Sequence, residues 1–229
     1  MKKSKRYQEI KNKIEDRPYS LDDSVNLIKD ISSAKFDESV EIHLMTNADP
    51  KNADEQLRTV ADLPHGTGKK VRVLVFAEGD AAVSAKEAGA DFVSDDEIVK
   101  NIEKGWQDFD VAIATPDQMS KIGKLGKFLG RKGLMPNPKS ETVTKDVSTA
   151  VKNSKAGQIR YKSDKQGIIH SRIGQVGYTE KQLEENLVTF LTDVKKAKPP
   201  SAKGVYISKV SISSTMGKGL ELDMASLSF

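Results

Sequence analysis

The amino-acid sequence predicts a two-domain α/β protein in which one domain is inserted into the other. The middle of the chain alternates between continuous apolar runs and helix-forming segments, as in a small parallel sheet covered by helices. Both ends instead combine an amphipathic helix with half-exposed strands, in which polar and apolar residues alternate. A chain of 229 residues, 37% of them hydrophobic, is long enough for two domains of ordinary size.

The N-terminal part predicts one helix and one half-exposed strand. Residues 2–13 carry a net charge of +5 but lack the apolar run of a secretory signal. Ser20 and Asp23 can cap a helix, whose apolar side consists of Leu21, Val25, Ile28 and Ile31. Residues 38–46 alternate in the manner of a strand, with Val40, Ile42 and Leu44 on one side and Ser39, Glu41 and His43 on the other. We expect residues 57–63 to form the neighbouring strand.

The middle of the chain predicts three buried strands with helices between them. The strands are expected at residues 71–77, 92–93 and 109–114. The helices are expected over residues 80–88, from a capping box of Ser94 and Glu97 to Gly105, and after Thr115–Pro116–Asp117. This spacing is typical of strand–helix–strand units in a parallel sheet.

The C-terminal part returns to half-exposed strands. Residues 158–162 and 168–173 flank a plausible hairpin loop at 163–167. An amphipathic helix is expected over residues 180–194, with Leu183, Leu187, Phe190, Leu191 and Val194 facing inward. Residues 205–213 alternate again, with Val205 and Ile207 opposite Tyr206 and Ser208.

The two flanks therefore predict one outer domain built from both chain ends, residues 1–67 and 157–229. The inserted domain would be residues 68–156. Both crossings, residues 64–68 and 155–157, contain glycine, which accommodates changes of backbone direction at low energy.

Catalytic and cofactor motifs are poorly represented. The absence of cysteine excludes disulfides, thiolate zinc sites, iron–sulfur clusters and a cysteine nucleophile. The histidines His43, His65 and His170 are far apart in sequence and have no metal-binding spacing. No stretch approaches the 18 apolar residues of a membrane span. We therefore expect no catalytic residue, no metal, no cofactor and no membrane partner, and a cytoplasmic protein.

The nucleotide-binding motifs also fail. A phosphate loop ending at Gly68–Lys69 would need a glycine at Leu63 and a serine or threonine at Lys70. A dinucleotide fingerprint starting at Gly79 would place its next glycines at Ala81 and Ser84. These failures argue against an enzyme that uses a nucleotide on the parallel sheet.

Two segments favour nucleic-acid binding, and each has a simpler structural alternative. Residues 121–139 carry six basic residues, no acid and four glycines, so they are either a solvated loop or a surface that meets phosphate. Residues 213–219 are either a hairpin turn or a platform of small and hydroxyl residues that approaches RNA closely. Phe36 is either a core anchor or a stacking face for a base, and the residue pattern alone favours the core.

Seven stretches of the sequence closely resemble the ribosomal protein L-one family, that is, protein number one of the large ribosomal subunit. These stretches are Ala34–His43 (AKFDESVEIH), Asp62–Ala77 (DLPHGTGKKVRVLVFA), Glu87–Val93, Gly105–Asp117, Leu129–Lys139 (LGRKGLMPNPK), Asp164–His170 (DKQGIIH) and Ser214–Gly219 (STMGKG). They occur in the family's order and together span the chain from about Phe36 to Gly219. The resemblance implies an outer split α/β sandwich domain with an antiparallel sheet and an inserted Rossmann-like three-layer domain with a parallel sheet.

The resemblance also implies a function and a set of RNA contacts. Such proteins bind large-subunit ribosomal RNA, form the mobile stalk near the tRNA exit site, assist release of deacylated tRNA, and, in bacteria, repress translation of their own messenger RNA. The implied partners are thus ribosomal RNA, exit-site tRNA and the protein's own messenger RNA leader, and we expect a monomer when the protein is free of the ribosome. The RNA contacts carried over to this sequence are Lys35, Phe36, Ser39, Glu41, Lys165, Gly167, His170, Ser213, Thr215, Met216 and Gly217. Ser39 stands where threonine is expected in many members, which keeps the hydroxyl. The resemblance favours Phe36 as a residue at the RNA boundary. Besides the RNA-binding ribosomal protein and the nucleotide-using enzyme, a third hypothesis is a protein-interaction module that binds no nucleic acid.

Overall fold

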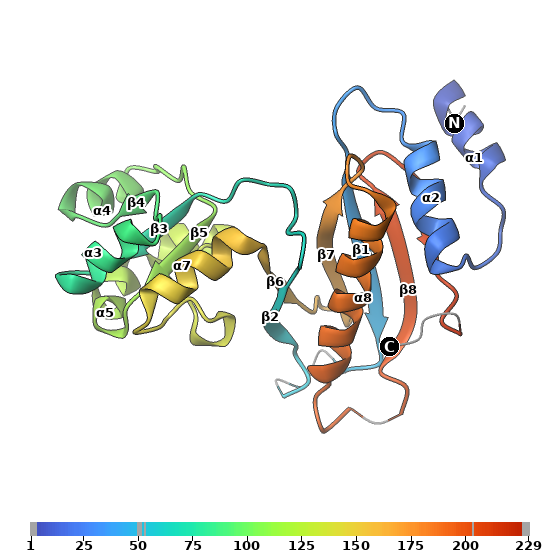
Figure 1. Cartoon of the computed structure of the whole chain (residues 1–229). Helices are drawn as coiled ribbons and strands as arrows, with labels where there is room; N and C mark the ends of the chain where they lie inside the picture. Colours follow the sequence, from blue (N-terminus) through green and yellow to red (C-terminus); the bar gives the residue numbers. More distant parts are fainter. Residues whose placement is uncertain (1–3, 50–51, 53, 203, 226–229) are drawn as a thin grey trace. The chain divides into compact units, whose positions relative to one another are not determined.

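The computed structural model describes residues 4–49, 52, 54–202 and 204–225, and the chain divides into two compact units (Figure 1). The outer unit combines the chain up to Gly68 with the chain from Ile159 onward, and the inner unit is Lys69–Gln158. An antiparallel sheet in the first and a parallel sheet in the second confirm the predicted α/β fold class.

The outer unit is built on a four-stranded antiparallel sheet with the order β7-β1-β8-β9. The strands are β1 (Ser39–Thr46), β7 (Ile168–Gln175), β8 (Ile207–Ser214) and β9 (Leu220–Glu221). Helices α2 (Leu21–Ile31) and α8 (Glu180–Lys196) pack against each other and on one face of this sheet (Figure 1). A further helix, α1 (Lys5–Lys13), had no counterpart among the sequence-based predictions.

The two packed helices form as their sequences predict. The Ser20 hydroxyl accepts the backbone N–H of Asp23 at the start of α2. Thr179 and Gln182 form a reciprocal capping box at the start of α8. Both helices bury their apolar side in one core with the sheet, including the expected Leu183, Leu187, Phe190, Leu191 and Val194.

Strand β1 alternates as predicted, but its neighbours differ from the prediction. Val40, Ile42 and Leu44 are buried, and β1 pairs with β7 on one side and β8 on the other. The expected neighbour, β2 (Arg58–Asp62), instead pairs with β6 (Gln158–Lys162) in a separate two-stranded sheet. Tyr161 of β6 packs edge-on against Phe190 of α8, with ring centroids 5.0 Å apart, so this strand pair is held against the helix.

Two further details of the C-terminal strands correct the sequence analysis. Strands β6 and β7 belong to different sheets, and a single bridge between Ser163 and Ile169 joins them at the expected hairpin. Val205 precedes β8 and is 73% exposed, whereas Tyr206 is buried. A break in register opposite Met45 and Thr46 puts Ile207 and Val210 on the buried face, so simple alternation fails there.

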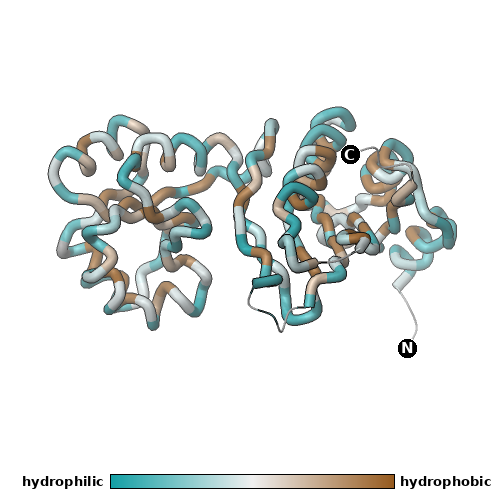
Figure 2. The backbone as a smooth tube through the Cα atoms, turned by 90° about the horizontal axis from the view of Figure 1, so that it is seen from below, coloured by the Kyte–Doolittle hydropathy of each residue, from teal (hydrophilic) through white to brown (hydrophobic). Residues whose placement is uncertain are grey.

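The inner unit is a three-layer structure around a parallel sheet with the order β4-β3-β5. Its strands are β3 (Val73–Phe76), β4 (Phe92–Val93) and β5 (Val111–Ala114). Helices α3 (Asp80–Glu87) and α7 (Val147–Ala156) share one apolar core with the sheet, and α4 (Asp96–Glu103) and residues 122–129 share the other. Figure 2 shows the apolar strands inside this unit and hydrophilic segments around them.

One prediction for the inner unit is wrong in detail. The N-cap of α4 is Asp95, whose carboxylate accepts the Ile98 backbone N–H at 2.8 Å, rather than Ser94. The basic segment 121–139 contains short helical turns, which follow the turn Pro116–Gln118. These are α5 (Met119–Ile122), Gly123–Leu125, α6 (Gly126–Leu129), Gly130–Lys132 and Pro138–Ser140. They form because Ile122, Leu125 and Leu129 are buried against the sheet, which leaves the basic side chains exposed.

Candidate nucleic-acid interface

In the described part of the chain, helices cover only one face of the outer sheet (Figure 1). The open face presents polar side chains from three neighbouring strands. They are Ser39, Glu41 and His43 from β1, His170 and Arg172 from β7, and Lys209, Ser211 and Ser213 from β8. The predicted contacts Ser39, Glu41, His170 and Ser213 thus lie on one surface.

At one end of this face, the loop before β1 meets the turn after β8. The backbone N–H of Thr215 donates to the Ser39 carbonyl at 3.0 Å. The Ser39 N–H in turn donates to the Thr215 hydroxyl at 3.0 Å. Residues 35–39 and 213–217, which are 170 or more positions apart in sequence, are thereby brought together.

A buried carboxylate, Glu38, fixes this junction. Its two oxygens accept the backbone N–H groups of Ala34 at 3.1 Å and Met216 at 2.9 Å. Burial alone would raise the pKa of Glu38, but the hydrogen bonds from the backbone N–H groups of Met216 and Ala34 hold it below its usual value. Glu38 therefore stays ionised at neutral pH and ties the loop to the turn.

Helix α1 also reaches the turn. The guanidinium of Arg6 donates to the Met216 carbonyl at 2.9 Å. With the Glu38 bond to the Met216 N–H, both backbone groups of this residue are engaged by charged side chains. The backbone of the turn is thus held in place while its side chains remain outside.

Two large apolar side chains are exposed at this end of the sheet. Phe36 and Met216 are each 54% exposed. Apolar surface rimmed by polar residues is a feature of interaction sites. The core interpretation of Phe36 is therefore wrong, and its ring is available to a partner.

The opposite end of the face carries the loop between β6 and β7. Lys165 is exposed there, whereas Gly167 is buried beneath it. Asp164 accepts the backbone N–H groups of Gln166 and Ile168, both at 2.8 Å, and the bond from Ile168 contributes most to lowering the pKa of Asp164. An eight-residue strand spans about 27 Å, so β1 separates the predicted contacts into two groups joined by the open face.

Both predicted glycine contacts have a reason within the protein. Gly167 has a φ of +77°, and a β-carbon there would come within 3.0 Å of the Ala48 carbonyl oxygen. A β-carbon at Gly217 would collide with the Ser214 hydroxyl. The conformations of the loop and the turn therefore require these glycines, independently of any contact with RNA.

Sequence reasoning missed three residues that organise this surface: Glu38, His43 and Arg172. The alternation of β1 does place His43 on the open face, between Glu41 and Met45. No local pattern indicates that Glu38 is buried, because its partners lie four and 178 residues away.

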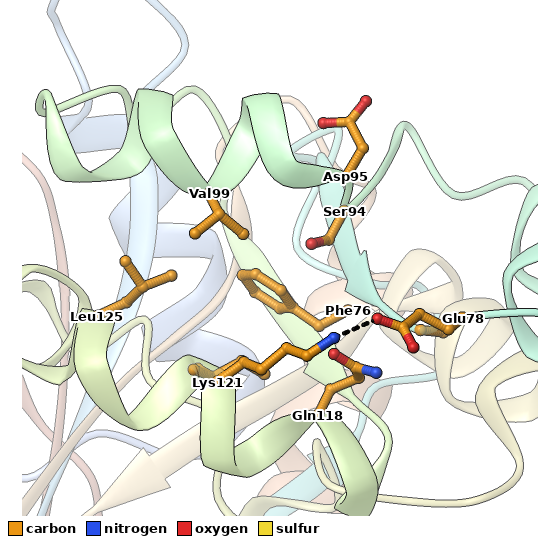
Figure 3. Close-up of a pocket in the computed structure, with 10 residues that line it drawn as sticks. Phe76, Glu78, Ser94, Asp95, Val99, Gln118, Lys121 and Leu125 are labelled. Atoms are coloured by element: carbon orange, nitrogen blue, oxygen red, sulfur yellow. Dashed lines mark hydrogen bonds and ion pairs between the residues drawn. The ribbon is translucent and has the colours of Figure 1, made fainter.

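The inner unit contains a small cavity of about 270 Å³ at the ends of β3 and β4. Its floor includes Phe76, and its rim includes Glu78, Asp95 and Lys121 (Figure 3). Lys121 pairs with Glu78 across the opening, at 2.5 Å. The carboxylates make this opening unfavourable for phosphate. Among the described residues, no group of three or more histidine, aspartate or glutamate side chains could hold a metal ion, and no helix is long and apolar enough to cross a membrane.

Sequence comparison decides the family. Residues 28–218 match the family model described as Ribosomal protein L1p/L10e family. The chain belongs to the ribosomal protein L1 family. This result confirms the resemblance seen in the sequence motifs, and membership of a ribosomal protein family agrees with the prediction of a non-enzymatic protein.

Relatives in this family are similar along nearly the whole chain. Proteins named "Large ribosomal subunit protein uL1" from Kosmotoga olearia, Francisella philomiragia and Proteus mirabilis are each 51% identical to it. The matches cover 97%, 98% and 99% of this chain and 96%, 97% and 98% of the respective relatives. The similarity thus extends over both units of this L1-family chain.

Proposed function

We propose that this protein binds large-subunit ribosomal RNA through the open face of its outer sheet and the two loop regions at the ends of that face. The observation that carries the proposal is the junction of the loop before β1 with the turn after β8. There, Glu38 and Thr215 fix the backbone, and Phe36 and Met216 point outward. The names of the relatives support ribosomal RNA as the partner.

The side chains on this surface suit the groups that RNA displays. Lys35, Lys165 and Arg172 can pair with phosphates. Hydroxyls such as that of Ser213, and the carboxylate of Glu41, can hydrogen-bond 2′-hydroxyl groups and base edges. Phe36 can stack on an unpaired base, and Met216 can pack an adaptable apolar tip against a nucleotide.

On the ribosome, we propose that the protein forms the mobile stalk near the tRNA exit site and assists release of deacylated tRNA. The exposed basic residues of the inner unit support a second RNA contact, to stalk RNA or to exit-site tRNA. These residues are Lys124, Lys127, Arg131, Lys132 and Lys139. Replacing the first four of them by glutamine should weaken tRNA crosslinking on the ribosome while leaving the affinity of the free protein for ribosomal RNA within about threefold.

The same outer surface would also make the protein a translational repressor. If its own messenger RNA leader folds into a structure like the ribosomal site, both RNAs compete for one interface. Competition titrations test this directly. Simultaneous binding of the leader and the ribosomal fragment would contradict a shared site.

A mobility-shift experiment tests the main proposal. The full chain is titrated against a stalk fragment of large-subunit ribosomal RNA, a scrambled RNA of equal length, and ATP or NAD as labelled nucleotides. We expect tight binding of the stalk fragment alone. Equal affinity for the scrambled RNA would leave only non-specific charge attraction, and nucleotide binding would favour the enzyme hypothesis.

We further propose that the outer unit is an independent RNA-binding domain. Its core and that of the inner unit consist of separate residue clusters. Replacing residues 69–158 by a short linker should leave a folded protein whose affinity for the stalk fragment is reduced less than tenfold, about 1.4 kcal/mol. An unfolded product, or a larger loss, would contradict this division.

A further inference from the structure

Two histidines face each other at the centre of the open sheet face. His43 of β1 and His170 of β7 are directly opposite in the register, and their rings lie 5.1 Å apart, edge to face. The Nδ1 atoms of the two rings are 2.9 Å apart, which is a hydrogen-bond distance. Such a bond requires a proton on one Nδ1 and a free lone pair on the other.

The outer nitrogens of the pair contact two further side chains. Nε2 of His170 lies 3.5 Å from a carboxylate oxygen of Asp164, and Nε2 of His43 lies 3.1 Å from the Ser213 hydroxyl. The carboxylate can only accept, so it favours a proton on Nε2 of His170. In the neutral pair, Nδ1 of His170 then accepts from Nδ1 of His43, and Nε2 of His43 accepts from Ser213.

We propose that His43 and His170 together take up one proton, and that this proton strengthens RNA binding by the outer sheet. The inference rests on the proposed RNA-binding function and adds a regulation to it. One further proton fits the network, because it occupies Nε2 of His43 and every hydrogen bond in the network is kept. The Ser213 oxygen then accepts from His43, and its own hydrogen becomes free to donate to RNA.

A second proton does not fit. It would set two N–H groups against each other across 2.9 Å and place two like charges side by side. The pair therefore takes up one proton as a unit and gains one positive charge, and that uptake belongs to the pair rather than to either histidine alone.

The other charged groups of the open face do not supply this pH-dependent change of charge. Glu41 and Arg172 lie opposite each other in the row beside the pair. Lys209 is paired with Glu221 at 2.5 Å, and Asp164 and Lys165 lie in the loop next to His170. Carboxylates, lysines and arginines ordinarily keep their charge between pH 5.5 and 7.5.

The electrostatic environment sets the direction of the change. Burial is the main cause that lowers the pKa of His43, and the charge of His170 lowers it further, while Glu41 partly opposes them. The neutral pair therefore prevails at pH 7.5. Because the protonated pair binds RNA more tightly, affinity rises as the pH falls, and bound RNA raises the pKa of the pair.

The experiment is a titration of the full chain with the ribosomal stalk fragment at pH 5.5, 6.5 and 7.5. One added phosphate contact increases affinity about fivefold at 0.15 M salt and about tenfold at 0.05 M salt, from a salt slope of about 0.8 per contact. These values are upper limits, and we expect the affinity of the parent to rise towards them as the pH falls from 7.5 to 5.5. The double variant H43Q/H170Q should abolish the gain, whereas each single variant keeps one histidine that can still take up a proton. H65Q, which changes the histidine paired with Glu185 away from this face, should retain the gain.

A measurement on the free parent protein does not depend on the variants. Imidazole ¹⁵N chemical shifts should show His43 and His170 sharing one proton in a single step, and H170Q should make His43 titrate alone. Independent uptake of two protons would overturn the proposal. An RNA affinity that is the same at all three pH values, or a loss of the low-pH gain in affinity in H65Q, would overturn the inference and leave the RNA-binding function intact. No binding at any pH would contradict both.

Discussion

The change Glu38→Gln tests how the RNA-facing junction is held together. The carboxylate accepts two backbone N–H groups, one from Ala34 and one from Met216. Glutamine keeps the shape and one acceptor oxygen, but it turns an NH₂ group toward the second N–H. The variant therefore loses one hydrogen bond to a charged acceptor, worth about 1.5–3 kcal/mol.

This loss should appear in the outer unit alone. A destabilisation of this size lowers a melting temperature by roughly 4–10 °C in a domain of about 150 residues. Helix circular dichroism follows both units, whereas the single tryptophan, Trp106, belongs to the inner unit and provides an internal control. We expect the tryptophan transition to stay in place. The affinity for the stalk fragment should fall more than tenfold, because the turn carrying Met216 loses its position.

The pH dependence follows from the lowered pKa of Glu38. A carboxylate whose pKa is lower in the folded state stabilises the fold above its ordinary pKa of 4.5, and the contribution is lost as the pH falls through the folded value. The stability difference between parent and E38Q should be constant from pH 6 to 8 and shrink below pH 4.5. E41Q, which removes the same charge from the open face of β1 three residues later, is the stability control. An E38Q protein that melts with the parent and binds RNA equally well would refute this account of the junction.

Three further outcomes are expected. T215V removes the hydroxyl that bonds to Ser39, so it should lose about 1 kcal/mol of stability and at least tenfold in RNA affinity. T215S should stay close to the parent, and equal behaviour of T215V and T215S would show that the hydroxyl is irrelevant. F36A should change stability by less than about 0.5 kcal/mol but weaken RNA binding by about 1–3 kcal/mol through lost stacking, whereas V205A, at another exposed apolar residue, should bind as the parent does. The logarithm of affinity should fall with the logarithm of salt concentration with a slope equivalent to about three to six phosphate contacts, at about 0.7–0.9 each, and a flat dependence would assign the basic segments to solvent alone.

Local patterns predicted most elements of this fold because local physics determines them. The buried run of β3, the cap of α2, the apolar side of α8 and the alternation of β1 each depend on residues within a few positions of one another. The pairing of strands, in contrast, depends on residues that are far apart in the sequence. Nothing in residues 57–63 distinguishes pairing with β1 from pairing with β6, which follows about 100 residues later.

In the candidate site, too, locally determined features could be predicted and long-range contacts could not. Exposed members such as Phe36 and Met216 could be proposed from motif resemblance, and their exposure supports them. Glu38 could not, because its role arises from a contact across 178 residues. The proximity of His43 and His170 depends on the register between β1 and β7, which the sequence does not specify. The helical turns of residues 121–132 escaped prediction because three glycines mask the spacing of Ile122, Leu125 and Leu129.

Hydrogen exchange with and without bound ribosomal stalk RNA tests the central claim most directly. It reports backbone protection along the whole chain without any substitution. If the outer sheet and its two ends form the interface, protection should increase in residues 34–43, 164–172 and 211–217, while α3 and α4 of the inner unit stay unchanged. Protection confined to residues 121–139, with none along β1 or in the turn after β8, would contradict the account.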